Sequence, residues 1–245
     1  MSDREIPPPS AASVKNLFPT TRWTIVRSLN NGERRVRFTA WDEFCRSYQR
    51  PLQAWLNTRT RNPQQTEELV QSFLAQLPHK EHAIDALNPS QGKLRAWLLT
   101  CLKRHWINTL RLHRPDRADL PDDFPDPTPP SDDLYDREWA FSLASRVLGS
   151  LKDEYVARGK SPLFDALLQS LDHPAETNRT AECQILGMTP NAFAVAFMRF
   201  RERLAVRLRE EVAATVIGDN PHDIDAELRH LVTILSRHGG LAAAC

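Results

Sequence analysis

Apolar residues recur at three- and four-residue steps along most of the chain, the spacing that places side chains on one face of an α-helix. The first stripe covers residues 38–56, the second residues 69–77, and a third begins at Leu94. With a shorter helix near residues 21–29, these stripes predict antiparallel helices that pack against each other. Further helices are expected at residues 131–155, from Pro162, at 180–186, at 191–212 and at 224–235. No segment alternates with period two, so the predicted fold class is all-α.

Two short segments carry strong signals for helix starts. Asn62 followed by Pro63 is typical of a capping residue before a proline in the first helical turn. Gly187, Thr189 and Pro190 follow a short helix and precede a long one. This order predicts a helix-turn-helix, whose second helix normally enters the DNA major groove, although any helical hairpin can use a similar turn.

Composition excludes several classes of protein. The chain has 245 residues with a formal net charge of +1 and 41% hydrophobic residues, as expected of a soluble globular protein. Its eight glycines match neither a phosphate-binding loop nor a dinucleotide fingerprint. The four cysteines are far apart, and we expect reduced thiols in a cytoplasmic protein. We therefore expect no catalytic residues, no metal, no cofactor and no membrane span.

Charge is distributed in blocks. Residues 91–117 hold seven basic residues against one acid, whereas residues 118–138 hold eight acids against one arginine. A basic block beside an acidic one indicates either a polyanion-binding face with a tethered acidic strip or two adjoining solvated surfaces. Six prolines fall between residues 115 and 130, which predicts a linker over this range.

Several motifs occur in the same order as in one known family. They are Phe18-Pro19-Thr20-Thr21-Arg22-Trp23, Tyr48-x-x-Pro51-Leu52, Glu68-Leu69-Val70-Gln71-x-Phe73, Leu94-Arg95-Ala96-Trp97-Leu98-Leu99, Leu186-Gly187-Met188-Thr189 and Asp225-x-Glu227-Leu228-Arg229-His230-Leu231. Together they resemble bacterial RNA polymerase sigma factors of the extracytoplasmic-function (ECF) group, especially its planctomycete-like branch.

The resemblance implies a domain layout. It consists of a flexible N-terminus (1–17), a sigma-two domain for core polymerase and the −10 element (18–114), the acidic linker (115–130), a sigma-four helix-turn-helix domain for the −35 element (131–215) and a C-terminal helical extension (216–245). The expected partners are the clamp helices of core RNA polymerase and promoter DNA.

The resemblance also assigns a core-polymerase-binding segment, made of Glu67, Glu68, Val70 and Gln71. Family members usually carry another acid just before this pair of glutamates, where this chain has Gln64, Gln65 and Thr66. Phosphorylation of Thr66 by a Ser/Thr kinase would supply negative charge near the helix N-terminus. The alternative is that Thr66 is an ordinary exposed residue of the first turn. An anti-sigma protein is a further candidate regulator.

The expected DNA-binding residues lie on two helices. They are Lys93, Arg95, Lys103, Arg104, His105, Trp106 and Arg111 on the first, and Thr189, Asn191, Arg199, Arg201 and Arg203 at the helix-turn-helix. Arginines and lysines neutralise phosphates, and His105 or Trp106 can stack on a base. The second helix is apolar where relatives tend to carry Lys or His, so it is expected to anchor phosphates more than to read bases.

The sequence as a whole predicts a non-enzymatic sigma factor. The main alternative is a sigma-like adaptor or decoy that binds polymerase or another protein without productive promoter recognition, as the apolar second helix allows. A helical enzyme is a third possibility, but the sequence has no convergent set of catalytic groups.

Overall fold

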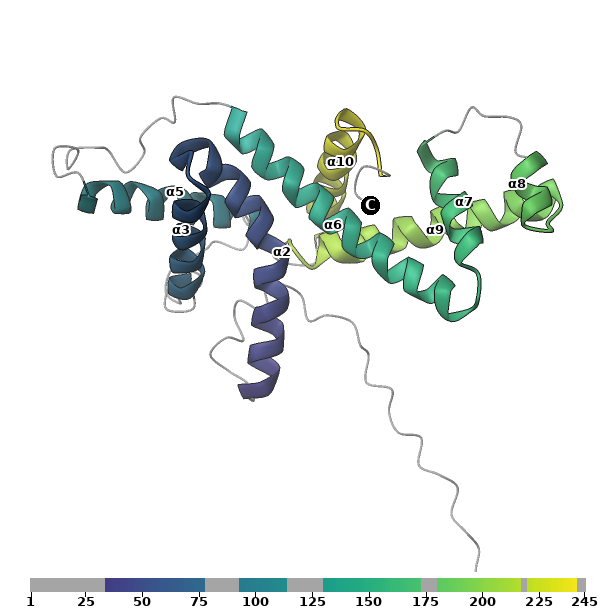
Figure 1. The fold of residues 1–245 in the computed structure, drawn as a ribbon, viewed down its shortest axis with the longest axis horizontal. Coiled ribbons are helices and arrows are strands. Elements are labelled where there is room, and N and C mark those ends of the chain that lie inside the picture. The colour runs from purple at the N-terminus through teal and green to yellow at the C-terminus, as the bar shows by residue number, and fades with distance from the viewer. Residues whose placement is uncertain (1–33, 78–92, 114–129, 173–179, 217–219, 242–245) are drawn as a thin grey trace, which may run out of the picture.

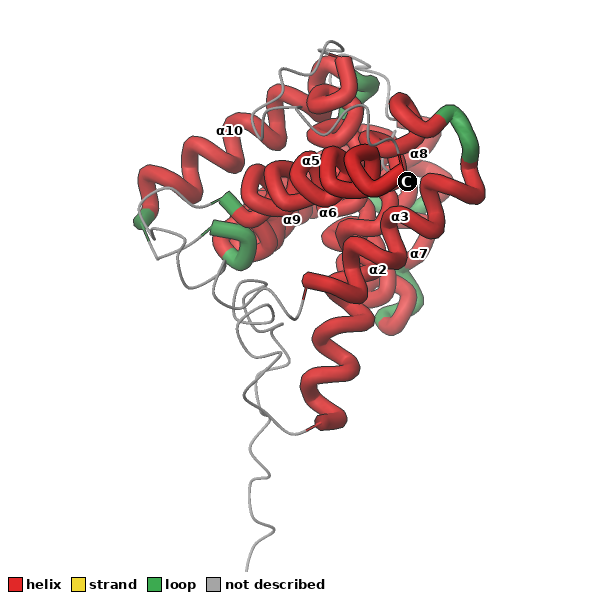
Figure 2. Tube along the Cα trace, turned by 90° about the vertical axis from the view of Figure 1, so that its left-hand side faces the viewer, coloured by secondary structure: helices red, strands yellow, loops and turns green. Residues whose placement is uncertain are grey.

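The computed structural model of the protein describes residues 34–77, 93–113, 130–172, 180–216 and 220–241 (Figure 1). Its elements are α2 (Arg34–Thr60), α3 (Pro63–Gln76), α5 (Leu94–His113), α6 (Pro130–Ala157), α7 (Ser161–Asp172), α8 (Thr180–Ile185), α9 (Pro190–Ala213) and α10 (Pro221–Arg237). Figure 2 shows helices and loops and no strand in these ranges, which confirms the all-α prediction. The helix expected near residues 21–29 and the linker up to residue 129 lie outside the described residues.

Two long helices connect the ends of the molecule. In Figure 1, α2, α3 and α5 form a group at one end, α7 and α8 lie at the other, and α6 and α9 run between them. The N-terminal part of α6 lies beside α2 and α5, where Asp132 accepts a hydrogen bond from Trp55. Toward its other end α6 packs against α7 and α9, while α10 packs on both α6 and α9. One helix therefore contacts both halves of the chain.

The helix starts follow the local sequence. The Asn62 side chain accepts hydrogen bonds from the backbone N–H groups of Gln64 and Gln65, and Pro63 occupies the first turn of α3. Thr189 caps α9 in the same way, accepting from the N–H of Ala192. Asn220 caps α10 by accepting from His222. Each cap satisfies donors that have no partner within the helix, so the predicted starts at residues 62 and 189 are confirmed.

Buried side chains from every described helix join one connected apolar cluster. Tyr155, Phe164 and Phe200 form one aromatic group of this cluster, between α6, α7 and α9. Phe200 makes edge-on ring contacts with the other two at centroid distances of 5.8 and 6.2 Å. Phe38, the first residue of the predicted stripe in α2, is instead 75% exposed. The apolar stripes thus hold the helices together across both halves.

Candidate nucleic-acid interface

The basic helix α5 is fixed at its start by the end of α9. The backbone N–H of Leu94 donates to the carbonyl of Thr215 at 3.0 Å, and Lys93 forms an isolated antiparallel bridge with Val216. Leu94, Leu98 and Leu102 are fully buried. These contacts set which face of α5 meets solvent.

The solvent face of α5 follows a four-residue spacing. Its exposed residues are Ala96, Thr100, Arg104, Asn108 and Leu112. Among the basic residues predicted to bind DNA, Arg104 is therefore on the open face, and Arg111 is half-buried. Trp106 is also half-buried and packs against the apolar cluster.

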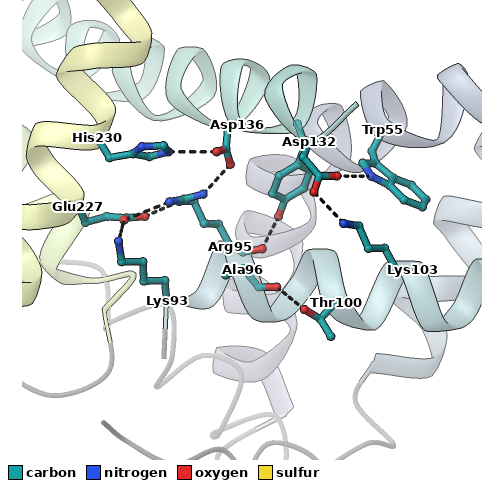
Figure 3. Close-up of polar contacts among 11 residues, drawn as sticks. Trp55, Lys93, Arg95, Ala96, Thr100, Lys103, Asp132, Asp136, Glu227 and His230 are labelled. Carbon is teal, nitrogen blue, oxygen red and sulfur yellow. Dashed lines mark hydrogen bonds and ion pairs between the residues drawn. The ribbon is translucent and has the colours of Figure 1, made fainter. Parts of the chain in front are cut away.

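Arg95 lies at the centre of an ion network that joins α5 to α6 and α10 (Figure 3). Its Nε donates to Glu227 Oε1 at 2.5 Å, and its Nη1 donates to Asp136 Oδ1 at 2.6 Å. Lys93 Nζ lies 2.8 Å from the other oxygen of Glu227. His230 Nε2 lies 3.0 Å from Asp136 Oδ2. We call these five residues the α5–α10 ion network.

The centre of the network is closed to water, whereas Lys93 and His230 at its edge are partly exposed. The side chain of Arg95 is 12% exposed and that of Glu227 only 1%. Burial raises the pKa of the Glu227 carboxyl, but hydrogen bonds and charges from Arg95 and Lys93 outweigh burial and hold it below its usual value. Burial likewise raises the pKa of Asp136, and His230 with Arg95 brings it below the ordinary range. Both carboxylates are therefore ionised partners at neutral pH.

A second contact lies one turn earlier on α6. Lys103 Nζ is 2.7 Å from Asp132 Oδ2, and the indole N–H of Trp55 donates to Asp132 Oδ1 at 3.0 Å. The buried hydroxyl of Tyr135 donates to the carbonyl of Arg95 at 3.0 Å. Acids in the first turns of a helix also interact favourably with its dipole. The start of α6 thus neutralises part of the basic face of α5.

Three of the predicted site residues lie inside the protein. Val70 belongs to the apolar cluster, so its side chain is not presented to a partner in this structure. Thr66 is 2% exposed, and its hydroxyl oxygen lies 2.6 Å from that of Thr60, which contradicts an exposed first-turn residue. His105 is buried beside Phe73 and pairs with Ser72 at 3.0 Å, so it presents no surface for a base. All three lie on the inward faces of α3 and α5.

The outer face of α3 carries the remaining predicted polymerase contacts. Glu67, Glu68 and Gln71 are exposed. Gln71 donates to Glu67 at 3.2 Å, and Gln64 donates to Glu68 at 3.1 Å. These four-residue side-chain contacts leave a polar, negatively charged surface.

The segment from α8 to α9 has helix-turn-helix geometry. Gly187 has a φ of +63°, and its N–H donates to the carbonyl of Gln184, while Met188 donates to that of Cys183. This is the paired hydrogen-bond pattern of a helix end with a left-handed residue, which favours glycine. The Thr189 cap then starts α9 two residues later.

On α9, the predicted DNA-binding residues divide into two groups. Asn191, Arg199 and Arg201 are exposed, as is Thr189 at the cap. Arg203 instead pairs with Glu154 of α6, which also binds Arg207 at 3.0 Å. Before Arg199, α9 also exposes apolar side chains: Met198 is 62% exposed and Val195 is 41% exposed.

The sequence did not reveal the partners of the basic residues. Asp136 and Glu227 are separated from Arg95 by 41 and 132 positions. The only signal was the presence of an acidic block beside a basic one. That block includes Asp132 and Asp136, whereas Glu227 and His230 appeared only as part of a terminal motif.

One segment of the chain matches a known family model. Residues 44–115 match the family model of sigma-70 region 2. The match supports a place in the RNA polymerase sigma-factor family. It covers most of α2 and all of α3 and α5. The sigma-factor family is not a class of enzymes. No curated protein and no solved structure matches the chain.

The described ranges hold neither a candidate membrane span nor a candidate metal site. None of the helices described there is both long and apolar enough to cross a membrane. The same ranges contain no group of three or more His, Cys, Asp and Glu side chains arranged to hold a metal ion.

Proposed function

We propose that this chain is an ECF-type sigma factor of the planctomycete-like branch that acts in the cytoplasm. In this proposal the exposed face of α3 binds the clamp helices of core polymerase, and α5 contacts the −10 element. The observation that carries the proposal is the region 2 match on three packed helices with an acidic outer face on α3 and a basic α5. The domain layout at residues 18–114, 115–130, 131–215 and 216–245 belongs to the same proposal.

The contacts with polymerase are assigned to the side chains that α3 presents to solvent. Glu67, Glu68 and Gln71 provide two charges and an amide without any rearrangement. Carboxylates on this surface favour a basic counterpart on the clamp. Val70 has a different role: its burial holds α3 in place.

The contacts with DNA are assigned to two places. Arg104 on α5 and Arg199 and Arg201 on α9 are exposed and suit phosphate binding. Thr189 and Asn191 lie at the start of α9, the part of a recognition helix that faces the base edges. The helix-turn-helix geometry of the α8–α9 segment supports its assignment to the −35 element.

Phosphorylation of Thr66 is not part of this proposal. A kinase must reach the hydroxyl, and this hydroxyl is buried against Thr60. A phosphate at that position would also carry about −1.5 to −2 charges into the interface between α2 and α3, at a high desolvation cost. An anti-sigma partner has no particular observation in its favour either.

The adaptor or decoy remains a second candidate because of one observation. Four basic residues are paired with acids of the protein itself: Lys93 just before α5, Arg95 and Lys103 on α5, and Arg203 on α9. On α9, Met198 and Val195 are exposed. A protein with these features can bind polymerase without binding DNA productively.

Capture on core polymerase followed by in vitro transcription separates the two candidates. Purified full-length protein is incubated with bacterial core polymerase, and transcript 5′ ends are mapped on a genomic DNA template. A sigma factor is captured and gives defined start sites. An adaptor is captured without adding start sites, and failure of capture contradicts both candidates.

A further inference from the structure

The C-terminal helix α10 supplies a buried acid to the basic helix of the region 2 fold. Glu227 lies between Lys93 and Arg95, and both of its oxygens are in contact with these cations. Its side chain is 1% exposed, which is unusual for a glutamate unless it is paired. The matched family region ends at residue 115, so Glu227 comes from a separate part of the chain.

These contacts occupy the groups that a phosphate would use. A guanidinium binds phosphate through parallel N–H donors, and here Nε and Nη1 of Arg95 donate to Glu227 and Asp136. Arg95 Nη2 also donates to Glu227, at 3.3 Å. A DNA phosphate can therefore use the Nε and Nη2 edge of Arg95 only by displacing Glu227.

α10 is held by contacts that are independent of α5. Its apolar face, which includes Ile224, Leu231 and Ile234, is buried where α10 packs against α6 and α9. Asp225 on its outer side pairs with Arg209 of α9. Apolar packing on α6 and α9 therefore holds α10 in place, and the contact of Glu227 with Lys93 and Arg95 is an additional charged contact.

We propose that α10 is an autoinhibitory helix, in which Glu227 competes with DNA phosphates for Lys93 and Arg95. Binding of DNA to this part of α5 then requires release of Glu227 from the two cations. The proposal rests on the proposed function, because it assigns α5 to DNA. Since the two states exclude each other, loss of the Glu227 charge strengthens DNA binding, and DNA in turn loosens α10.

The first test measures binding of the full-length protein to a fluorescein-labelled duplex of mixed sequence by fluorescence anisotropy. Glu227→Gln is expected to bind about tenfold more tightly than the wild type. In a plot of log K against log salt, the slope should also become steeper, by about 0.9 for each additional phosphate that the protein neutralises. Asp165→Asn, on the exposed surface of α7, removes the same charge elsewhere and is expected to leave both quantities unchanged.

A double variant tests whether Arg95 is one of the two cations that Glu227 releases. Adding Arg95→Gln to Glu227→Gln should reduce the increase in affinity, because one of the two released cations is then absent. The proposal is overturned if Glu227→Gln binds no more tightly than the wild type, including the case in which neither protein binds the duplex. An equal increase in affinity for Asp165→Asn also overturns it.

Hydrogen exchange of the wild type provides a test that does not depend on the folding of a variant. Saturating amounts of the same duplex should increase amide exchange in α10, at residues 221–237, and leave α7, at residues 161–172, unchanged. Unchanged protection of α10 in the DNA complex contradicts the proposal. Capture on core polymerase, measured on the same preparations, tests the proposed function separately. If the protein is captured but Glu227 does not compete with DNA, only the autoinhibitory role of α10 is overturned.

Discussion

At the scale of single residues, Glu227 is a buried carboxylate with two identified cationic partners. Replacing it with glutamine leaves Lys93 without its counter-charge and Arg95 with Asp136 alone. We expect Glu227→Gln to lower the free energy of unfolding by about 3 kcal/mol in urea at neutral pH. Asp225→Asn, on the same helix but in a half-exposed pair with Arg209, should cost less than about 1 kcal/mol. Equal costs for the two variants would contradict the buried ion network.

The same carboxylate predicts a pH dependence. The folded-state pKa of Glu227 lies below its usual value, so its contribution to stability is complete above the unfolded-state pKa of about 4.3. It is lost as pH falls through the lower folded-state value. The difference in unfolding free energy between the wild type and Glu227→Gln should therefore shrink from about pH 5 to about pH 3. A difference that stays constant over this range would exclude a depressed pKa at this position.

The burial of Thr66 predicts the effect of a negative charge at this position. Thr66→Asp places a charge where the wild-type side chain is 2% exposed and bonded to Thr60, so it should destabilise the protein by at least about 2 kcal/mol. Thr66→Ser keeps the hydroxyl and should cost about 1 kcal/mol through loss of a methyl group. Thermal unfolding of both variants tests this. An Asp variant as stable as the wild type, or one that captures polymerase better, would restore the phosphorylation hypothesis.

At the scale of elements, substitution of a glycine has opposite effects in a turn and in the interior of a helix. Gly187 has a φ of +63° at the turn before α9, and Gly149 lies inside α6; a Cβ would meet no atom within 4 Å at either position. Gly187→Ala should therefore cost about 1 kcal/mol through backbone strain alone. Gly149→Ala should stabilise the protein by about 0.5–1 kcal/mol. Urea unfolding of both variants measures this, and the same sign for both would contradict the turn geometry.

Local sequence was sufficient to predict most helices and their starts. The Asn62 and Thr189 side chains each bond to backbone N–H groups no more than three residues further along, so both caps can be predicted from local sequence. The apolar stripe of α3 also places Val70 inside, although the family resemblance assigned it to the polymerase surface. Periodicity is the better guide here because burial is decided by the position of a residue on its helix.

At the scale of the whole molecule, the sequence predicted which segments are basic and which are acidic, but not which of their residues pair. A basic block and an acidic block were evident, but the pairing of Arg95 with Glu227 depends on how α10 docks, 132 positions away. No local pattern specifies that docking. The blocks suggested an exposed polyanion-binding face, whereas the structure shows that part of this face is neutralised by α6 and α10.

The central claim is that the chain binds core polymerase through the outer face of α3. The most direct measurement is the affinity of the full-length protein for bacterial core polymerase, compared with that of Glu67→Lys/Glu68→Lys. Both side chains are exposed, so the fold should be retained, and binding should weaken about 100-fold through charge reversal. Asp165→Lys on α7 should bind like the wild type. Equal affinity of the α3 variant and the wild type, or no binding by the wild type, would contradict the account.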